Sequence, residues 1–319
     1  MKSGFQMQAL SQSSLFPTTI IFLIIIAVNA YLQPGFFTID VLKSNLASFT
    51  PLILASMAQA IVVIVGGLDL SNGTTITLAT VIMASLMTDS GMYNLGVILL
   101  ALLAAIIVGI VNGFSIGYLR LPPIIATFAT SAICFGVSLL IMPQPGGYVP
   151  PFFYQMYSDT FLFIIPVPLL LVIVALIIWS FIHKRKLYRY IYAVGGDEEA
   201  SYANGIRTPL IKVLAFVISS VFLTLAAIAI ISQTASGDAK IGNPYTLNSI
   251  AAVVIGGIAL KGGRGNLIGA ALGAMILGLI VNIIFFANIS SFYQELIKGL
   301  IIIVALAISI LPTLQTRKV

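Results

Sequence analysis

"LGVILLALLAAIIVGIVNGFSIGYL", residues 95–119, is an apolar run without a charged side chain. A helix needs roughly 20 residues to cross the hydrocarbon core of a bilayer, which is about 30 Å thick, so this run is long enough. It does not alternate apolar and polar residues, as a strand of a membrane barrel would. The run therefore predicts a membrane-spanning helix.

Similar runs recur along the chain and indicate its class. Of the 319 residues, 60% are hydrophobic and 8% are charged, far from the composition of soluble proteins. We expect an all-α integral membrane protein with one transmembrane domain over residues 1–319 and about ten transmembrane helices. The predicted helices lie near residues 15–32, 46–65, 74–88, 95–119, 123–142, 161–182, 210–232, 247–260, 267–287 and 296–311. The first shows no clear signal-peptide cleavage site after it.

Basic residues predict the orientation. With a cytoplasmic N-terminus, most Lys and Arg residues fall in inner loops, and only Lys43, Lys240 and Lys298 fall outside. An even number of crossings then returns the C-terminus to the cytoplasm. The net charge of +6 thus reports membrane topology and not nucleic acid binding.

The sequence argues against an enzyme. It has no GxxxxGK[ST] phosphate loop and no HExxH motif, so we expect no ATP hydrolysis by this chain alone. Cys134 and His183 are the one cysteine and the one histidine, which excludes a metal site built from such ligands. We expect no metal and no cofactor on this chain. Cys134 reads as a small buried apolar side chain.

Two apolar stretches are interrupted by glycine and polar residues: "VVIVGGLDLSNGTTITLA", residues 62–79, and "AVVIGGIALKGGRGNLIGA", residues 252–270. They align on the pairs Gly66–Gly67 and Gly256–Gly257, which suggests a weak internal repeat. In transporters, such segments in two halves often mark broken helices along the substrate path. Asp69, in the first stretch, has two open interpretations, a helix cap or packing group and a member of the path, because a carboxylate at membrane depth is costly unless paired or wetted.

Glycines four residues apart form two stripes, Gly109, Gly113 and Gly117, and Gly265, Gly269 and Gly273. Such a stripe lets another helix approach closely, so we expect helix packing there. Asn112 and Asn282 lie in the same two predicted helices. Each could hydrogen-bond across a helix pair or face a hydroxylated ligand, and both are candidates for the substrate path.

One segment, "YRYIYAVGGDEEASYANGI" at residues 188–206, is polar and follows the basic cluster "HKRK". Asp197, Glu198 and Glu199 suit the first turn of a short helix, where carboxylates favour the positive end of the helix dipole. Ala200 continues that helix and Gly205 can end it. So short a helix is marginal alone in water, which implies that it docks on another protein.

The segment "YIYAVGGDEEASYANGI", residues 190–206, resembles the coupling loop of ribose-type sugar permeases of ATP-binding-cassette (ABC) importers. Three further stretches match that family in the same order. They are "GGLDLSNG" at 66–73, "VGIVNGFSIGYLRLPPIIATFAT" at 108–130 and "NSIAAVVIGGIALKGGRGNLIGAALGAMILGLIVN" at 248–282. Leu68 and Asp197 depart from the family's usual Ile and Asn. The external loop "IMPQPGGYVPPFF", residues 141–153, has no match and is a candidate for docking of a binding protein.

The resemblance implies a multi-pass permease subunit in the bacterial plasma (inner) membrane. Its implied partners are a second permease copy or paralogue, two cytoplasmic ATPase subunits that use ATP and Mg²⁺, and an extracytoplasmic substrate-binding protein. The coupling loop, about 188–207, then meets the ATPase through Gly195, Gly196, Asp197, Glu198, Glu199, Ala200 and Gly205. The implied substrate is a monosaccharide.

Other functions remain open from sequence. Related permeases carry nucleosides, autoinducer-like furanosyl compounds and amino acids. An ion-coupled secondary transporter would need ionisable groups in the membrane, for which Asp69 is the one candidate. A membrane scaffold without transport is disfavoured by the polar interruptions in both halves.

Overall fold

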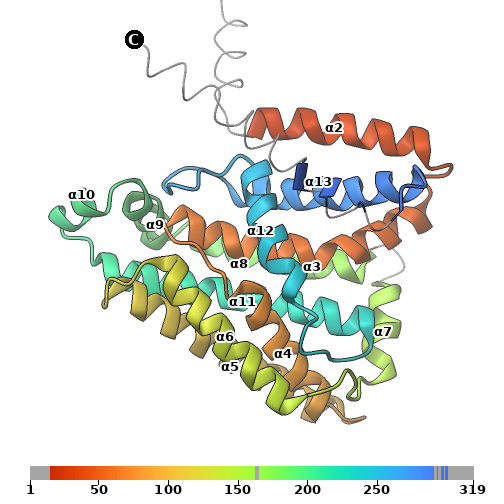
Figure 1. The fold of residues 1–319 in the computed structure, drawn as a ribbon, viewed down its shortest axis with the longest axis horizontal. Helices are drawn as coiled ribbons and strands as arrows, with labels where there is room; N and C mark the ends of the chain where they lie inside the picture. The colour runs from red at the N-terminus through yellow and green to blue at the C-terminus, as the bar shows by residue number, and fades with distance from the viewer. Residues whose placement is uncertain (1–14, 162–164, 291–292, 294–295, 298, 301–319) are drawn as a thin grey trace, which may run out of the picture.

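The chain folds into helices that begin and end at proline, glycine and polar residues. The structure, a computed structural model, describes residues 15–161, 165–290, 293, 296, 297, 299 and 300 (Figure 1). Proline stands in the first turn of α6, α7, α8, α11 and α12, where its missing N–H costs nothing. The elements are α2 (Leu15–Leu32), α3 (Ile39–Ile64), α4 (Asn72–Leu86), α5 (Gly91–Gly117), α6 (Pro123–Ile141), α7 (Pro151–Ser158), β1 (Thr160–Phe161), β2 (Ile165–Pro166), α8 (Val167–His183), α9 (Lys186–Gly196), α10 (Glu198–Ala203), α11 (Thr208–Thr234), α12 (Asn243–Ile255) and α13 (Leu267–Phe286).

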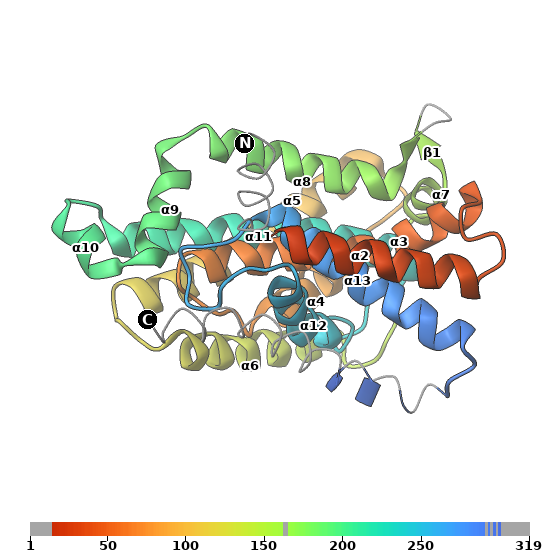
Figure 2. The same cartoon turned by 90° about the horizontal axis from the view of Figure 1, so that it is seen from above.

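The long helices run side by side along the longest axis of the molecule (Figure 2). One end carries α9 and α10, and we call it the α10 end. The other carries α7 and the two-residue strands β1 and β2, which pair antiparallel, and we call it the α7 end. The all-helical prediction is confirmed, with this short hairpin as an addition.

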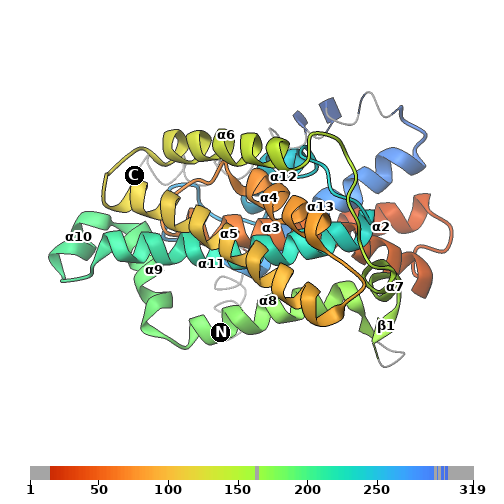
Figure 3. The same cartoon turned by 90° about the horizontal axis from the view of Figure 1, so that it is seen from below.

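The core lies around α3 and α11, which are mostly buried. α11 packs on α5 and α3, and α13 packs on α2, α3 and α12. α5 and α6 lie on the outer side of the helices (Figure 3). One face of these two helices is apolar and exposed, with Leu99, Leu103, Ile107 and Phe128 among its residues. A helix surface of this kind suits lipid, because every backbone polar group is already bonded within the helix.

Six described helices are long and apolar enough to cross a membrane, or seven if α8 and α9, bent by 84° at their junction, are one span. α4 has 15 residues and α12 has 13, each too short to cross alone. The count of about ten helices is therefore not confirmed. Its last member, 296–311, lies almost entirely outside the described residues.

The two short helices begin partway between the α10 end and the α7 end (Figure 1). α3 ends at the α10 end, and residues 65–71 lead from there back to the start of α4. α11 ends at the α7 end, and residues 235–242 lead from there to the start of α12. Each short helix is thus the second half of a segment whose first half is irregular backbone. Such backbone is tolerated at membrane depth where protein buries it.

Candidate functional site

The loop before α4 is held by a buried chain of hydrogen bonds. Asp69 Oδ1 accepts from the backbone N–H of Ser71 at 2.8 Å and from its hydroxyl at 2.6 Å. Asn112 of α5 donates from Nδ2 to Ser71 Oγ at 2.8 Å. Asp69 is 3% exposed and Ser71 is fully buried. The structure thus brings together Asp69 and Asn112, two residues that the sequence placed in the path, and joins them through Ser71.

Thr127 of α6 fixes the same loop from another side. Its hydroxyl accepts from the N–H of Leu70 at 3.0 Å, and lies 3.2 Å from the carbonyl oxygen of Leu68. Sequence reasoning missed Thr127 and considered Ser71 only as a possible cap of the following helix. Both lie inside stretches that carry the resemblance, "GGLDLSNG" and "PPIIATFAT", so their position there was the available signal.

The starts of α4 and α12 touch through two reciprocal hydrogen bonds. The N–H of Gly73 donates to Thr246 Oγ1 at 3.2 Å, and the N–H of Gly242 donates to Thr77 Oγ1 at 2.9 Å. A methyl group on either glycine would collide with the carbonyl oxygen of the other. The two half-helices therefore form one contact in the interior.

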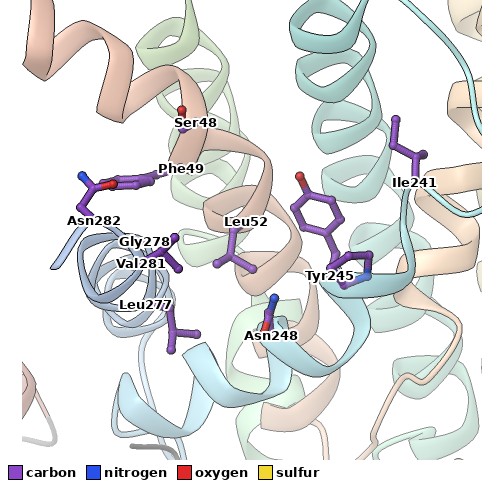
Figure 4. A pocket seen from close by; sticks show the side chains of 11 residues that line it. Ser48, Phe49, Leu52, Ile241, Tyr245, Asn248, Leu277, Gly278, Val281 and Asn282 are labelled. Atoms are coloured by element: carbon purple, nitrogen blue, oxygen red, sulfur yellow. The ribbon is translucent and has the colours of Figure 1, made fainter. Parts of the chain in front are cut away.

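Asn282 lies apart from Asp69 and Asn112. It lines a cavity of about 420 Å³ between α3, α12 and α13 (Figure 4), and its Nδ2 donates to Asn45 Oδ1 at 2.8 Å. The predicted path residues therefore fall into separate groups, and Asn282 alone among them lines this cavity.

Glycines from three segments meet at the α10 end, and we call Gly66, Gly195, Gly196, Gly262 and Gly263 the glycine junction. The N–H of Gly263 donates to the carbonyl oxygen of Ile64 at 2.8 Å. A methyl group on Gly195 would collide with that same oxygen, and one on Gly262 would lie 2.9 Å from the Cα of Gly66. The end of α9 is thus wedged between the end of α3 and the α12–α13 loop.

The segment after the junction forms the predicted short helix, α10. Asp197 is its N-cap and accepts from the N–H of Ala200 at 2.9 Å. Gly205 follows the helix with φ of 82°, a conformation that favours glycine. Glu198 forms an ion pair with Lys212 of α11 at 2.6 Å, while Glu199 is exposed. α10 thus presents carboxylates and the exposed Tyr202 at one end of the molecule.

Most predicted packing glycines lie at close helix crossings. Gly109, Gly113 and Gly117 of α5 face α11, where a methyl group on Gly113 would lie 2.5 Å from the Cα of Val213. Gly269 and Gly273 of α13 pack on Gly256 and Ala252 at the end of α12. Gly257, just after α12, has φ of 76°. The inclusion of Gly265 in the helical stripe is wrong. It lies in the loop before α13 with φ of 138°.

The arrangement offers binding and movement, not covalent chemistry. Residues 113–117, "GFSIG", fit the GxSxG pattern of serine hydrolases, yet they lie inside α5 and not at the strand-to-helix turn that exposes such a nucleophile. A bundle of apolar helices with two interior half-helices and an exposed helix at one end is the architecture of a membrane transport permease.

Comparison with known proteins agrees. The family described as branched-chain amino acid transport system / permease component matches residues 41–306, and the chain belongs to that family. The ribose import permease protein RbsC of Bacillus subtilis (strain 168) is 32% identical over 79% of this chain and 79% of its own length. RbsC of Escherichia coli (strain K12) is 31% identical over 90% of both chains. The D-allose transport system permease protein AlsC of the same strain is 29% identical over 91% of this chain and 90% of its own length. No solved structure matches.

Proposed function

We propose that this chain is the membrane-spanning subunit of an ABC importer and that it passes a monosaccharide through the bacterial inner membrane. The observation that carries the mechanism is the glycine junction, because it joins the exposed α10 segment to both Gly-interrupted stretches. The sugar follows from the relatives, which are named for ribose and D-allose and match along most of their length.

ATP and Mg²⁺ are bound by two partner ATPase subunits, which meet α10 through Asp197, Glu198, Glu199 and Ala200. Their closure moves α9 and α10. Because Gly195 leaves no space between the end of α3 and the α12–α13 loop, these two segments move with α9 and α10. The contact between α4 and α12 is then the interior element that changes between outward-open and inward-open states. Nucleotide shifts that equilibrium only by binding one state better than the other.

The α10 end faces the cytoplasm on this proposal, with both termini on the same side. Basic residues gather at this end, and loops on the cytoplasmic side of membrane proteins are enriched in Lys and Arg. These basic residues are Arg120, Lys184, Arg185, Lys186, Arg189, Arg207, Lys212, Lys261 and Arg264. If 65–86 and 235–255 each count as one broken span, the described helices make nine crossings. The tenth is the apolar run 296–311, which the sequence alone predicts.

The α7 end then faces outward and receives the substrate-binding protein. The unmatched loop 141–153 lies there and is tied down: Gly146 and Gly237 exchange backbone hydrogen bonds of 2.9 and 2.8 Å, and the N–H of Tyr148 donates to the carbonyl oxygen of Ala84 at 2.8 Å. A fixed loop is suited to docking. A second permease, a copy or a paralogue, completes the membrane unit.

An ion-coupled transporter is the second candidate, and it needs Asp69 to exchange a cation or proton with the path. Asp69 instead accepts two hydrogen bonds from Ser71 in a buried loop. Carriage of nucleosides, furanosyl compounds or amino acids by the same ABC machinery is the alternative substrate assignment.

Affinity purification of the full chain from its native membrane in mild detergent, followed by identification of co-purifying proteins, tests the assembly. We expect ATPase subunits. A chain that is recovered alone and still transports under an ion gradient would favour the secondary transporter.

A further inference from the structure

The cavity between α3, α12 and α13 is not explained by helix packing. It measures about 420 Å³, within the range of small-molecule sites. Figure 4 shows Asn282 and Tyr245 on opposite sides of it, with Asn248 and Leu52 between them. At α13 the ring of Phe49 packs on Gly278, where a methyl group would collide with it. The space is thus bounded by three helices, one of which, α12, also forms the half-helix contact with α4.

The polar groups of the cavity are all neutral. Ser48, Tyr245, Asn248 and Asn282 supply hydroxyl and amide groups, and none of the described lining residues is charged. Hydroxyls and amides both donate and accept, so they pair with the hydroxyl groups of a solute. Phe49, Leu52 and Leu277 supply the apolar part. A few placed polar groups on an apolar wall are typical of a small-molecule site.

The first three residues of α12 offer no free N–H group to an anion in this cavity. The N–H groups of Asn243 and Tyr245 are already bonded to the carbonyl oxygens of Lys240 and Gly242, at 3.1 and 2.9 Å. Pro244 between them has no N–H to give. Because none of the described lining residues is charged, a zwitterionic amino acid would find no charged partner for its carboxylate or ammonium group in this cavity.

One side chain is held in place before any solute arrives. Asn282 donates to Asn45 at 2.8 Å, which fixes its amide plane on the α13 side. Tyr245 and Asn248 are three residues apart in α12 and share a helix face. Side chains locked by such contacts bind with less loss of entropy.

We propose that this cavity is the position in the path where a neutral, polyhydroxylated solute binds, contacted by Asn248, Asn282 and Tyr245. The inference rests on the proposed function and adds the selectivity of its membrane subunit: neutral sugars pass and amino acids do not. Discrimination at this point is separate from that of the external binding protein.

The test uses proteoliposomes that hold the co-purified importer, with binding protein on one side and ATP on the other. Uptake of radiolabelled D-ribose, D-allose, D-galactose and L-leucine is measured for Asn248→Leu, Asn282→Leu and Tyr245→Phe. Asn243→Leu is the matched control, since Asn243 lies in the same helix, is exposed and does not line the cavity. ATP hydrolysis and partner recovery are measured in parallel.

We expect each cavity variant to lower sugar uptake about fivefold or more at low sugar concentration, which is the loss of one hydrogen bond, with ATP hydrolysis within about twofold of the unaltered chain. Asn243→Leu stays within about twofold in both. Unchanged uptake in the cavity variants, or an equal loss in Asn243→Leu, overturns the inference while the proposed function stands.

If the leucine variants fail to assemble, Tyr245→Phe decides, because it removes one oxygen atom: unchanged uptake by an assembled Tyr245→Phe importer overturns the inference. An unaltered importer that takes up leucine and none of the three sugars overturns the proposed function and this inference together.

Discussion

Gly73 and Gly242 lie against each other at the starts of α4 and α12. Each donates its backbone N–H to a threonine of the other helix, four residues after the partner glycine. The threonines, Thr246 and Thr77, stand in equivalent places, so the contact is nearly symmetric although the two segments are far apart in sequence. Small residues let the two backbones meet, and the hydroxyls satisfy N–H groups that the first turns leave open.

Gly73→Ala should destabilise the protein. The added methyl group meets the carbonyl oxygen of Gly242 and the hydroxyl of Thr246, and overpacking of this kind costs about 1–3 kcal/mol. We expect a lower apparent midpoint of thermal unfolding in detergent. Gly96→Ala, in α5 with open space around it, is the control and should keep or raise the midpoint. Equal midpoints for both variants would show that the contact does not form.

Thr77→Val and Thr246→Val test the hydroxyls at nearly constant volume. Each removes the acceptor of a glycine N–H in the interior, which should cost about 1–3 kcal/mol. Thr80→Val is the control, because the Thr80 hydroxyl bonds only to Ile76 in its own helix, at 2.8 Å, among the described residues. The measurement is again thermal unfolding in detergent, and a control that loses as much as the two test variants would contradict the prediction.

Gly195→Ala should uncouple ATP hydrolysis from transport. Its methyl group would displace the end of α3 and the α12–α13 loop at the glycine junction, whereas the neighbouring Gly196→Ala places its methyl group in open space. We expect Gly195→Ala to retain the ATPase subunits and to lose uptake at least tenfold, with Gly196→Ala near the unaltered rate. Normal uptake by Gly195→Ala would mean that the junction does not transmit movement.

Replacing Glu198 and Glu199 together with Lys should prevent docking of the ATPase, since the exposed face of α10 changes sign. Glu198→Gln is the control: it breaks the ion pair with Lys212, which is partly exposed and contributes little to stability. Recovery of ATPase subunits with the control and not with the double variant is expected. Normal transport by the double variant would contradict the assignment of α10 as the helix that docks on the ATPase.

Much of the fold could be predicted because lipid imposes simple rules. Long apolar runs without alternation can only be helices, and the carboxylates at Asp197, Glu198 and Glu199 marked a helix start that the structure places at α10. Capping and polarity are local properties, so the chain reveals them directly.

The contact between the two half-helices could not be predicted from sequence, although α4 and α12 lie close to the predicted helices 74–88 and 247–260. Residues 65–71 and 235–242 contain glycine and charged residues that indicate a break in the helix, but which groups satisfy their backbone depends on the packing of Thr127, Thr77 and their neighbours. The cavity residues Tyr245 and Asn248 were missed for the same reason. A tyrosine or asparagine near a helix start has no periodic pattern, and its function depends on which helices pack beside it.

Uptake of radiolabelled D-ribose by proteoliposomes that hold the complex purified through this chain is the most direct test of the central claim. The account predicts uptake that needs ATP on the side of α10 and the binding protein on the side of α7, and that stops with a non-hydrolysable ATP analogue. Uptake that continues without ATP and follows an imposed ion gradient would contradict it.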